Sequence, residues 1–165
     1  MQKYRDFDHT GDLGVEVFGD SLPALFRHAG EALVNIITDA DTIRTRESKA
    51  ITVQAEGLEQ LMVRWLNELL FLFESEGLLF KRFVVDAVDS DHLAVTAHGE
   101  SYDMDRHPIK TTVKGAIYHQ VEVVHSRAIL VPHFVEVRHP VTTAEDRQRV
   151  RLEQALFASH DLVAD

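Results

Sequence analysis

The sequence predicts a single α+β domain, in which a mostly antiparallel β-sheet packs around two main helices, plus a C-terminal helical extension. Two long segments carry apolar residues at helical spacing, and several runs show the alternation and β-branched content of strands. The two helices do not alternate singly with the strands, which argues against a doubly wound parallel sheet. A chain of 165 residues with 45% hydrophobic composition is also long enough to bury one core.

The first predicted strand lies near the N-terminus, in the stretch DFDHTGDLGVEVFG. Val15 and Val17 alternate with polar residues, which predicts a strand with one buried face. Asp8, His9 and Asp12 come at or just before the start of this strand, and we expect an opening loop there. The neighbouring glycines would let that loop turn tightly and aim several oxygens at one point.

The two predicted helices occupy residues 21–38 and 58–77. The first begins at Asp20 or Ser21, since either side chain can cap a helix N-terminus. The second ends at Gly77, a residue type that favours helix C-termini. Because the second helix is apolar over more than half its circumference, we expect it in the centre of the domain, with sheet on at least one side.

Further strand-like runs follow these helices. The short turn DSDH joins two of them as a predicted hairpin. Pro132 lies inside the last run, which indicates an edge strand or a bulge there. The runs are 50–55, 79–88, 92–98, 113–124 and 128–137.

The character of the sequence changes near its C-terminal end. Thr142 and Glu145 stand at capping-box spacing, which predicts a final helix near residues 143–158. Its apolar stripe is narrow, so the helix either packs loosely on the domain or serves a partner. We therefore divide the chain into a domain at 1–137 and an extension at 138–165.

The charge balance restricts the class of function. Lysine and arginine number 17 against 27 aspartates and glutamates, so the formal net charge is −10. An acidic chain without a basic cluster is disfavoured for direct nucleic-acid binding; acidity fits a cation, a basic protein partner or simply solubility. The chain has no cysteine and no run apolar enough for a membrane span. We expect a cytoplasmic protein.

Nucleophile-elbow, P-loop and dinucleotide-binding motifs are absent from the sequence. What it offers is a set of carboxylates, and oxygen donors without thiols favour calcium, magnesium or manganese. A turn cap at Asp8 and a solvated turn at Asp103 and Asp105 are the alternatives to ligation. The candidate donors are Asp8, Asp12, Glu100, Asp103, Asp105 and Glu136.

The ten histidines show no metal-type pairing such as HExxH. His107 and His119 are the better functional candidates, because each lies beside a turn or strand with other polar residues. A hydrogen-bonded structural histidine is the commoner alternative.

Several segments, in the same order, resemble the archease family. DHTGDLGVEVFGDSL resembles the archease opening, whose usual form is DHTADIGIEVYG. WLNELLFLFESEGLLF is similar to the central helix and the strand after it, and GESYDMDRHPIKTTVKGAIYHQVEV is similar to the GE, RH and KA-then-YH segments. The resemblance covers residues 4–137.

The resemblance implies a non-catalytic cofactor of the GTP-dependent RNA ligase that joins tRNA exon halves. Such a protein promotes guanylylation and multiple turnover of the ligase. The family binds a divalent cation through the aspartate of the opening motif, an aspartate at the chain's end and the terminal carboxylate. By position, these correspond to Asp12, Glu136 and Val137.

The resemblance also extends to basic strand positions. Lys114 and His119 match them, and with His9 we expect these residues to contact a partner rather than to catalyse a reaction.

Two departures from the family pattern bear on the cation. Glu136 is one methylene longer than the usual aspartate, a variation that calcium tolerates better than magnesium does. The chain continues for 28 residues beyond Val137, which can therefore offer only a backbone carbonyl. We expect weaker divalent binding, unless Glu145 or Asp146 supplies the missing acid.

Two other functions stay open at this point. One is a chaperone-like binding module in which the cation site is degenerate. The other is a metal-dependent hydrolase built on Asp8, His9 and Asp12.

Overall fold

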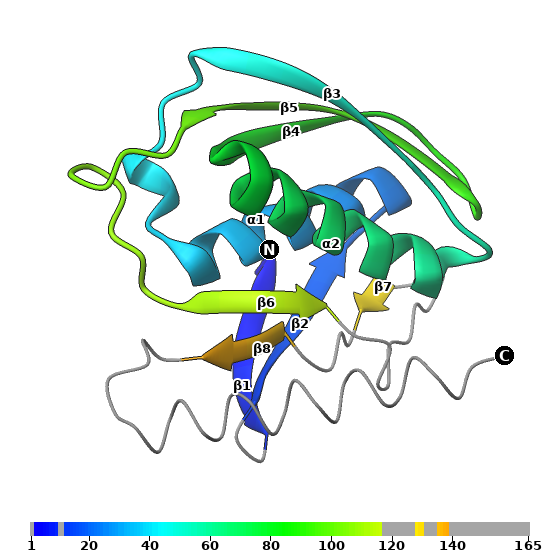
Figure 1. The fold of residues 1–165 in the computed structure, drawn as a ribbon. Helices are drawn as coiled ribbons and strands as arrows, with labels where there is room; N and C mark the ends of the chain where they lie inside the picture. Colours follow the sequence, from blue (N-terminus) through cyan, green and yellow to red (C-terminus); the bar gives the residue numbers. More distant parts are fainter. Residues whose placement is uncertain (1, 10–11, 117–127, 131–134, 139–165) are drawn as a thin grey trace, which may run out of the picture.

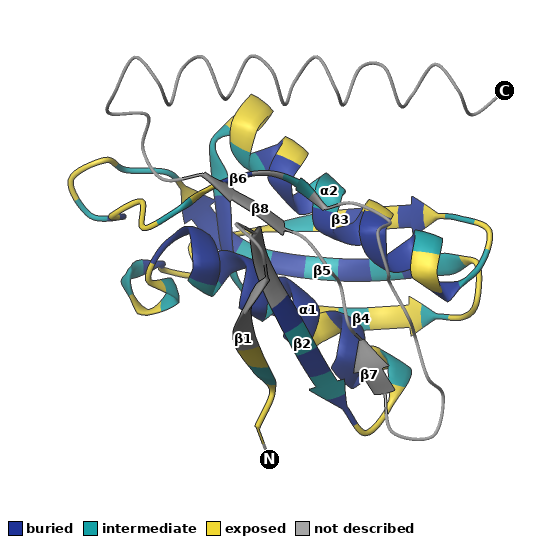
Figure 2. Cartoon of the chain, turned by 90° about the horizontal axis from the view of Figure 1, so that it is seen from below, coloured by how far each residue is buried: buried dark blue, intermediate teal, exposed yellow. Residues whose placement is uncertain are grey.

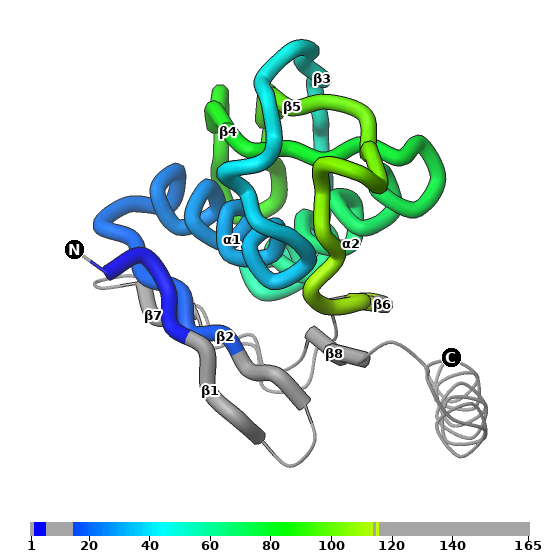
Figure 3. The backbone as a smooth tube through the Cα atoms, turned by 90° about the vertical axis from the view of Figure 1, so that its left-hand side faces the viewer, coloured from blue at the N-terminus to red at the C-terminus, as the bar shows by residue number. Residues whose placement is uncertain are grey.

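Two helices lie between two antiparallel sheets in the computed structural model (Figures 1 and 3). The structure describes residues 2–9, 12–116, 128–130 and 135–138, with the backbone alone for 6–9, 12–14, 114, 116, 128–130 and 135–138. The elements are β1 (Tyr4–His9), β2 (Asp12–Gly19), α1 (Leu22–Ile37), the 3₁₀ turn η1 (Ala40–Thr42), β3 (Glu47–Gln54), α2 (Leu58–Glu76), β4 (Leu78–Val88), β5 (His92–Ser101), β6 (Thr112–Ala116), β7 (Ala128–Leu130) and β8 (Val135–Arg138).

The larger sheet has the order β1-β2-β8-β6, with β7 paired to β2 beside this path. Each of its described pairings is antiparallel. Val15 and Val17 of β2 are buried against α1, as their alternation predicts. Strands from the beginning and the end of the domain thus lie side by side in this sheet.

The smaller sheet has the order β3-β5-β4 and covers the opposite side of the helices (Figure 1). The turn at residues 89–92 joins β4 and β5 as the predicted hairpin. Together the two sheets and two helices confirm the predicted α+β class with antiparallel pairing.

The prediction of an opening loop is wrong at Asp8 and His9. Both residues belong to β1, and Asp12 is the first residue of β2. The reason is that β1 lies at the edge of its sheet, where charged residues are tolerated and obscure the alternating pattern.

Helix α1 begins and ends where the sequence indicates. Ser21 is its N-cap, and the Ser21 hydroxyl accepts a hydrogen bond from the Ala24 amide at 3.3 Å. Thr38 ends the helix and is fully buried. That position matters for the site, because the segment leading into β6 is attached there.

Helix α2 lies in the centre of the domain, as its apolar surface predicts. It contacts β6 on one side and the three-stranded sheet on the other, and nine of its 19 residues are buried. Figure 2 colours the buried parts of the domain dark blue. Trp65 is fully buried and donates from Nε1 to the Phe26 carbonyl at 3.0 Å, which ties α2 to α1. Gly77 ends the helix in the left-handed conformation, with φ at 65°.

The strands predicted after residue 112 lie only partly within the described residues. The predicted strand at 113–124 is observed as β6 up to Ala116, and the run at 128–137 is observed as β7 and β8. The predicted helix near 143–158 lies outside the described residues. Neither helix of the described ranges has the length and hydropathy needed to cross a lipid bilayer.

Candidate functional site

Three strand pairings bring distant parts of the sequence together at one end of the larger sheet. In the β1–β2 hairpin, His9 is the partner of Asp12. Leu13 of β2 is paired with Val135 of β8, so Asp12 and Glu136 are the residues next to that pair. The backbone therefore brings the first and the last strand motifs of the domain into contact.

The third pairing connects β8 to β6. Val137 is the partner of Val113, and Lys114 follows Val113 in β6. The predicted cation ligands and two of the predicted contact residues thus lie on four strands of one sheet, β1, β2, β6 and β8. The described part of the chain does not include the side chains of these five residues, His9, Asp12, Lys114, Glu136 and Val137. His119, the remaining predicted contact residue, lies outside the described residues altogether.

A second polar cluster, fully described, surrounds the carboxylate of Glu100 at the end of β5. This carboxylate is only 3% exposed. Both Nη atoms of Arg106 donate to it, one to each oxygen, at 3.0 Å. His107 Nε2 lies 3.1 Å from Oε1, and the Arg44 amide donates to the same oxygen at 2.8 Å. The buried charge is thus compensated by an ion pair and further hydrogen bonds.

The hydrogen bonds of His107 determine where its ring carries a proton. The Asp103 backbone N–H donates to Nδ1 at 2.9 Å, so that nitrogen is an acceptor. The ring proton is then on Nε2 and points to Glu100. This fully buried histidine is a structural donor, which agrees with the commoner alternative given above.

Charge effects in the cluster stabilise the ionised forms. The hydrogen bonds from Arg106, ahead of every other contact, lower the pKa of Glu100 from 4.5 to about 2, although burial acts in the opposite direction. A hydrogen bond from the same guanidinium lowers the pKa of Asp103. In return, the two carboxylates raise the pKa of Arg106, Glu100 more than Asp103.

The oxygens of these carboxylates are already used by protein donors. Asp103 accepts the Asp105 amide at 2.9 Å and Arg106 Nε at 3.0 Å. This corrects the candidate ligand Glu100, whereas the turn contacts of Asp103 and the exposed position of Asp105 agree with the solvated turn given as their alternative. Within the described residues, no group of three or more histidines, cysteines, aspartates and glutamates is placed to hold a metal ion.

The same cluster fixes the segment 102–111, which connects β5 of the smaller sheet to β6 of the larger one. Two hydrogen bonds to the end of α1 hold its second half. The Thr38 hydroxyl donates to the Pro108 carbonyl at 2.7 Å, and the Lys110 amide donates to the Ile37 carbonyl at 2.8 Å. Strand β6 begins two residues later, so its starting point is set by these contacts.

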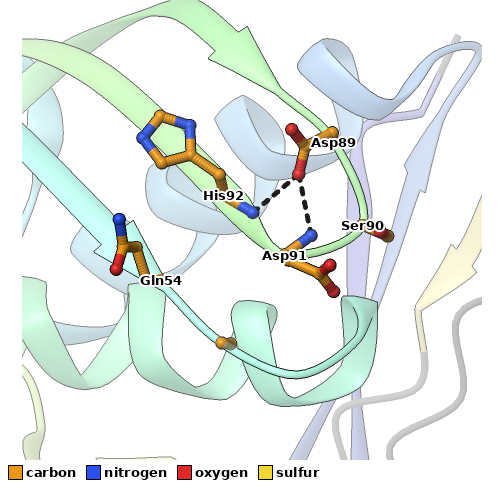
Figure 4. Close-up of a pocket in the computed structure, with 6 residues that line it drawn as sticks. Gln54, Asp89, Ser90, Asp91 and His92 are labelled. Atoms are coloured by element: carbon orange, nitrogen blue, oxygen red, sulfur yellow. Dashed lines mark hydrogen bonds between the residues drawn. The ribbon is translucent and has the colours of Figure 1, made fainter.

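An open pocket lies at the β4–β5 turn, at the opposite end of β5 from Glu100 (Figure 4). Its acidic side chains accept hydrogen bonds from backbone amides in and near the turn. Asp89 Oδ1 accepts the amides of Asp91 and His92 at 2.8 Å, and Asp91 Oδ1 accepts the Gly57 amide at 3.1 Å. These contacts stabilise the hairpin.

The sequence reasoning missed the Glu100–Arg106 ion pair. The alternation of the strand gave no signal for it, because Leu93, Val95 and Ala97 point inward and Glu100 is expected on the opposite, exposed face. Instead Glu100 is buried beside Gly99, where the alternation breaks, and its charge requires the nearby Arg106.

The chain matches the model of the Archease protein family (MTH1598/TM1083) over residues 4–135. It is 33% identical over 125 residues to an archease of Sulfurisphaera tokodaii, covering 74% of this chain and 89% of that relative. It is 34% identical over 123 residues to an archease of Methanopyrus kandleri, covering 73% and 88%.

A solved structure agrees with these matches. The solution structure of Methanobacterium thermoautotrophicum protein 1598 has a TM-score of 0.65 to this chain at 31% identity, covering 79% of this chain and 99% of that one. The chain belongs to the archease family.

Proposed function

We propose that this chain is a non-catalytic activator of a GTP-dependent, tRNA-splicing RNA ligase, and that it acts through a divalent cation held between β2 and β8. The pairing of Leu13 with Val135 carries this proposal. Activation here means that the protein raises the guanylylation of the ligase and its multiple turnover.

The chemistry of the proposed donors fits a hard cation. Asp12 and Glu136 supply carboxylate oxygens, and Val137 supplies a backbone carbonyl. Calcium, magnesium and manganese all prefer oxygen ligands of this kind. Two carboxylates and a carbonyl give fewer than the six to eight oxygens that calcium takes, so water or a partner group would complete the shell.

Strand geometry supports the sharing of one ion by the two carboxylates. Residues opposite each other in an antiparallel pair share a face, with Cβ atoms about 5 Å apart. Asp12 and Glu136 flank the Leu13–Val135 pair and stand in such a relation. Two carboxylates at that spacing can reach an ion whose oxygen ligands lie about 2.4 Å away.

The ligase assay tests the proposal directly. The purified chain is mixed with the RNA ligase of the same organism, labelled GTP and calcium, magnesium or manganese, and the labelled ligase is counted. We expect more guanylylated ligase with the wild-type chain than without it, and no gain with Asp12→Asn. Asp105→Asn removes the same charge from an exposed position and serves as the matched control.

The other candidate functions give different outcomes in the same assay. A chaperone-like module would raise the yield of active ligase equally well with Asp12→Asn and without added cation. A hydrolase would consume a substrate in the absence of the ligase and would lose that activity in Asp12→Ala. Unchanged guanylylation in the presence of the wild-type chain would contradict the proposal.

A further inference from the structure

We propose that Glu100, Arg106 and His107 are positioning residues for the proposed cation site, because they fix the segment from which β6 starts and β6 in turn holds β8. This inference rests on the proposed function for its ligand. It is argued from described side-chain contacts of the cluster and from the backbone pairings of β6 and β8.

The segment 102–111 is held firmly by the buried carboxylate of Glu100. Arg106 and His107 both bind the buried carboxylate of Glu100, at 3.0 and 3.1 Å. The Arg44 amide binds the same carboxylate from the connection that precedes β3. The segment is therefore attached through a charged, desolvated contact, which is more costly to break than a surface pair.

After the cluster, the chain is attached to the end of α1 before it enters β6. Pro108 and Lys110 bind the end of α1, and β6 begins at Thr112. The distance along the chain from His107 to Thr112 is five residues. The cluster and the two hydrogen bonds to α1 therefore fix the start of β6 together, and loosening the cluster leaves β6 less firmly positioned.

Strand β8 lies between β2 and β6 in the sheet order. It has only four residues, Val135–Arg138. Its pairing with β6 includes Val113 and Val137, whereas its pairing with β2 is the Leu13–Val135 pair. A strand this short takes its position mainly from its neighbours, so β6 determines where Glu136 and Val137 meet β2.

The cluster does not bind the cation in this account. Its three side chains use their hydrogen-bonding groups on one another, on the Asp103 carboxylate and on the backbone. Its contribution is comparable to that of groups outside the ligand shell of a metal, which orient the ligands and change affinity by about tenfold or more.

The test uses Arg106→Gln in the full chain, with Lys81→Gln as the control. Each change removes one positive charge, and within the described residues Lys81 pairs with the exposed Asp41 at 3.6 Å. Loss of a positive charge by itself favours cation binding. We expect the opposite for Arg106→Gln: calcium affinity by calorimetry falls about tenfold at a temperature where both variants are folded. Arg106→Lys should restore part of it.

Hydrogen exchange gives a second readout that needs no cation. Arg106→Gln should speed exchange at the backbone amides of β6 and β8 and leave the β4–β5 hairpin tip at the rate seen in Lys81→Gln. A lower unfolding midpoint with unchanged calcium affinity and unchanged exchange in β6 and β8 would overturn the inference. If the wild-type chain binds no divalent cation, the proposed function fails, and the inference fails with it; faster exchange would then show a purely structural coupling.

Discussion

Arg106 binds Glu100 through two parallel hydrogen bonds of 3.0 Å, one from each Nη atom to each carboxylate oxygen. The carboxylate is buried, whereas the Arg106 side chain is 31% exposed. This pair joins the end of the smaller sheet to the segment that enters the larger one. It is the described contact with the clearest consequences for stability.

Glu100→Gln should lower the free energy of unfolding by about 3 kcal/mol. The amide has the size of the carboxylate, but it removes the buried one of the two carboxylates that pair with the Arg106 guanidinium and turns an NH₂ group toward other donors. Urea unfolding measures the change, followed by the fluorescence of Trp65, the one tryptophan of the sequence. Glu76→Gln, in the exposed Lys49–Glu76 pair, is the control and should cost less than about 1 kcal/mol. Equal losses in the two variants would contradict this prediction.

Because of the Glu100 carboxylate, we expect the free energy of unfolding to depend on pH. Its pKa is lowered on folding from 4.5 to about 2, mainly by Arg106, so the folded state binds this proton less well than the unfolded state does. The resulting stabilisation is complete above pH 4.5 and is lost as the pH falls from 4.5 toward 2.

The measurement compares wild type with Glu100→Gln from pH 7 to pH 2.5. The difference between their unfolding free energies should be constant down to about pH 5 and then shrink. Other carboxylates also titrate in this range, but they do so in both proteins and cancel in the difference. A difference that stays constant down to pH 2.5 would contradict the assigned role of Glu100.

At Gly99, beside this cluster, the backbones of β4 and β5 lie too close together to admit a side chain, which allows a further test of the fold. A Cβ at residue 99 would lie 1.8 Å from the Leu79 carbonyl oxygen of β4, so that strand would have to move. Gly99→Ala should cost about 3 kcal/mol or more by thermal or urea unfolding. Gly115→Ala is the control, because its Cβ would lie 3.5 Å from Asn67 Oδ1, an ordinary contact. A Gly99→Ala protein as stable as the control would show that the β4–β5 register is wrong.

Much of the fold could be predicted from the sequence because its signals are local. The boundaries of α1 and α2 follow from capping residues and apolar spacing at Ser21 and Gly77. The β4–β5 hairpin follows from one turn between two alternating runs. Strand β1 was missed because an edge strand can carry charge without burying it.

The polar cluster could not be predicted in the same way, because its meaning depends on tertiary contacts. Glu100 looks like one more oxygen donor in the sequence, and only its burial and its donors Arg44, Arg106 and His107 make it structural. The pairing of Leu13 with Val135 joins residues more than a hundred positions apart, and periodicity carries no information on such pairings. The resemblance to archease, not the strand pattern, pointed to Asp12 and Glu136.

Calorimetric titration of the wild-type chain and Asp12→Asn with calcium tests the central claim most directly, with Asp105→Asn as the variant of equal charge. We predict one saturable binding event in the wild-type and Asp105→Asn proteins and its loss in Asp12→Asn, with weaker binding in Glu136→Gln. Identical binding curves for the wild-type and Asp12→Asn proteins, or no binding of calcium, magnesium or manganese by the wild-type chain, would contradict a cation held between β2 and β8.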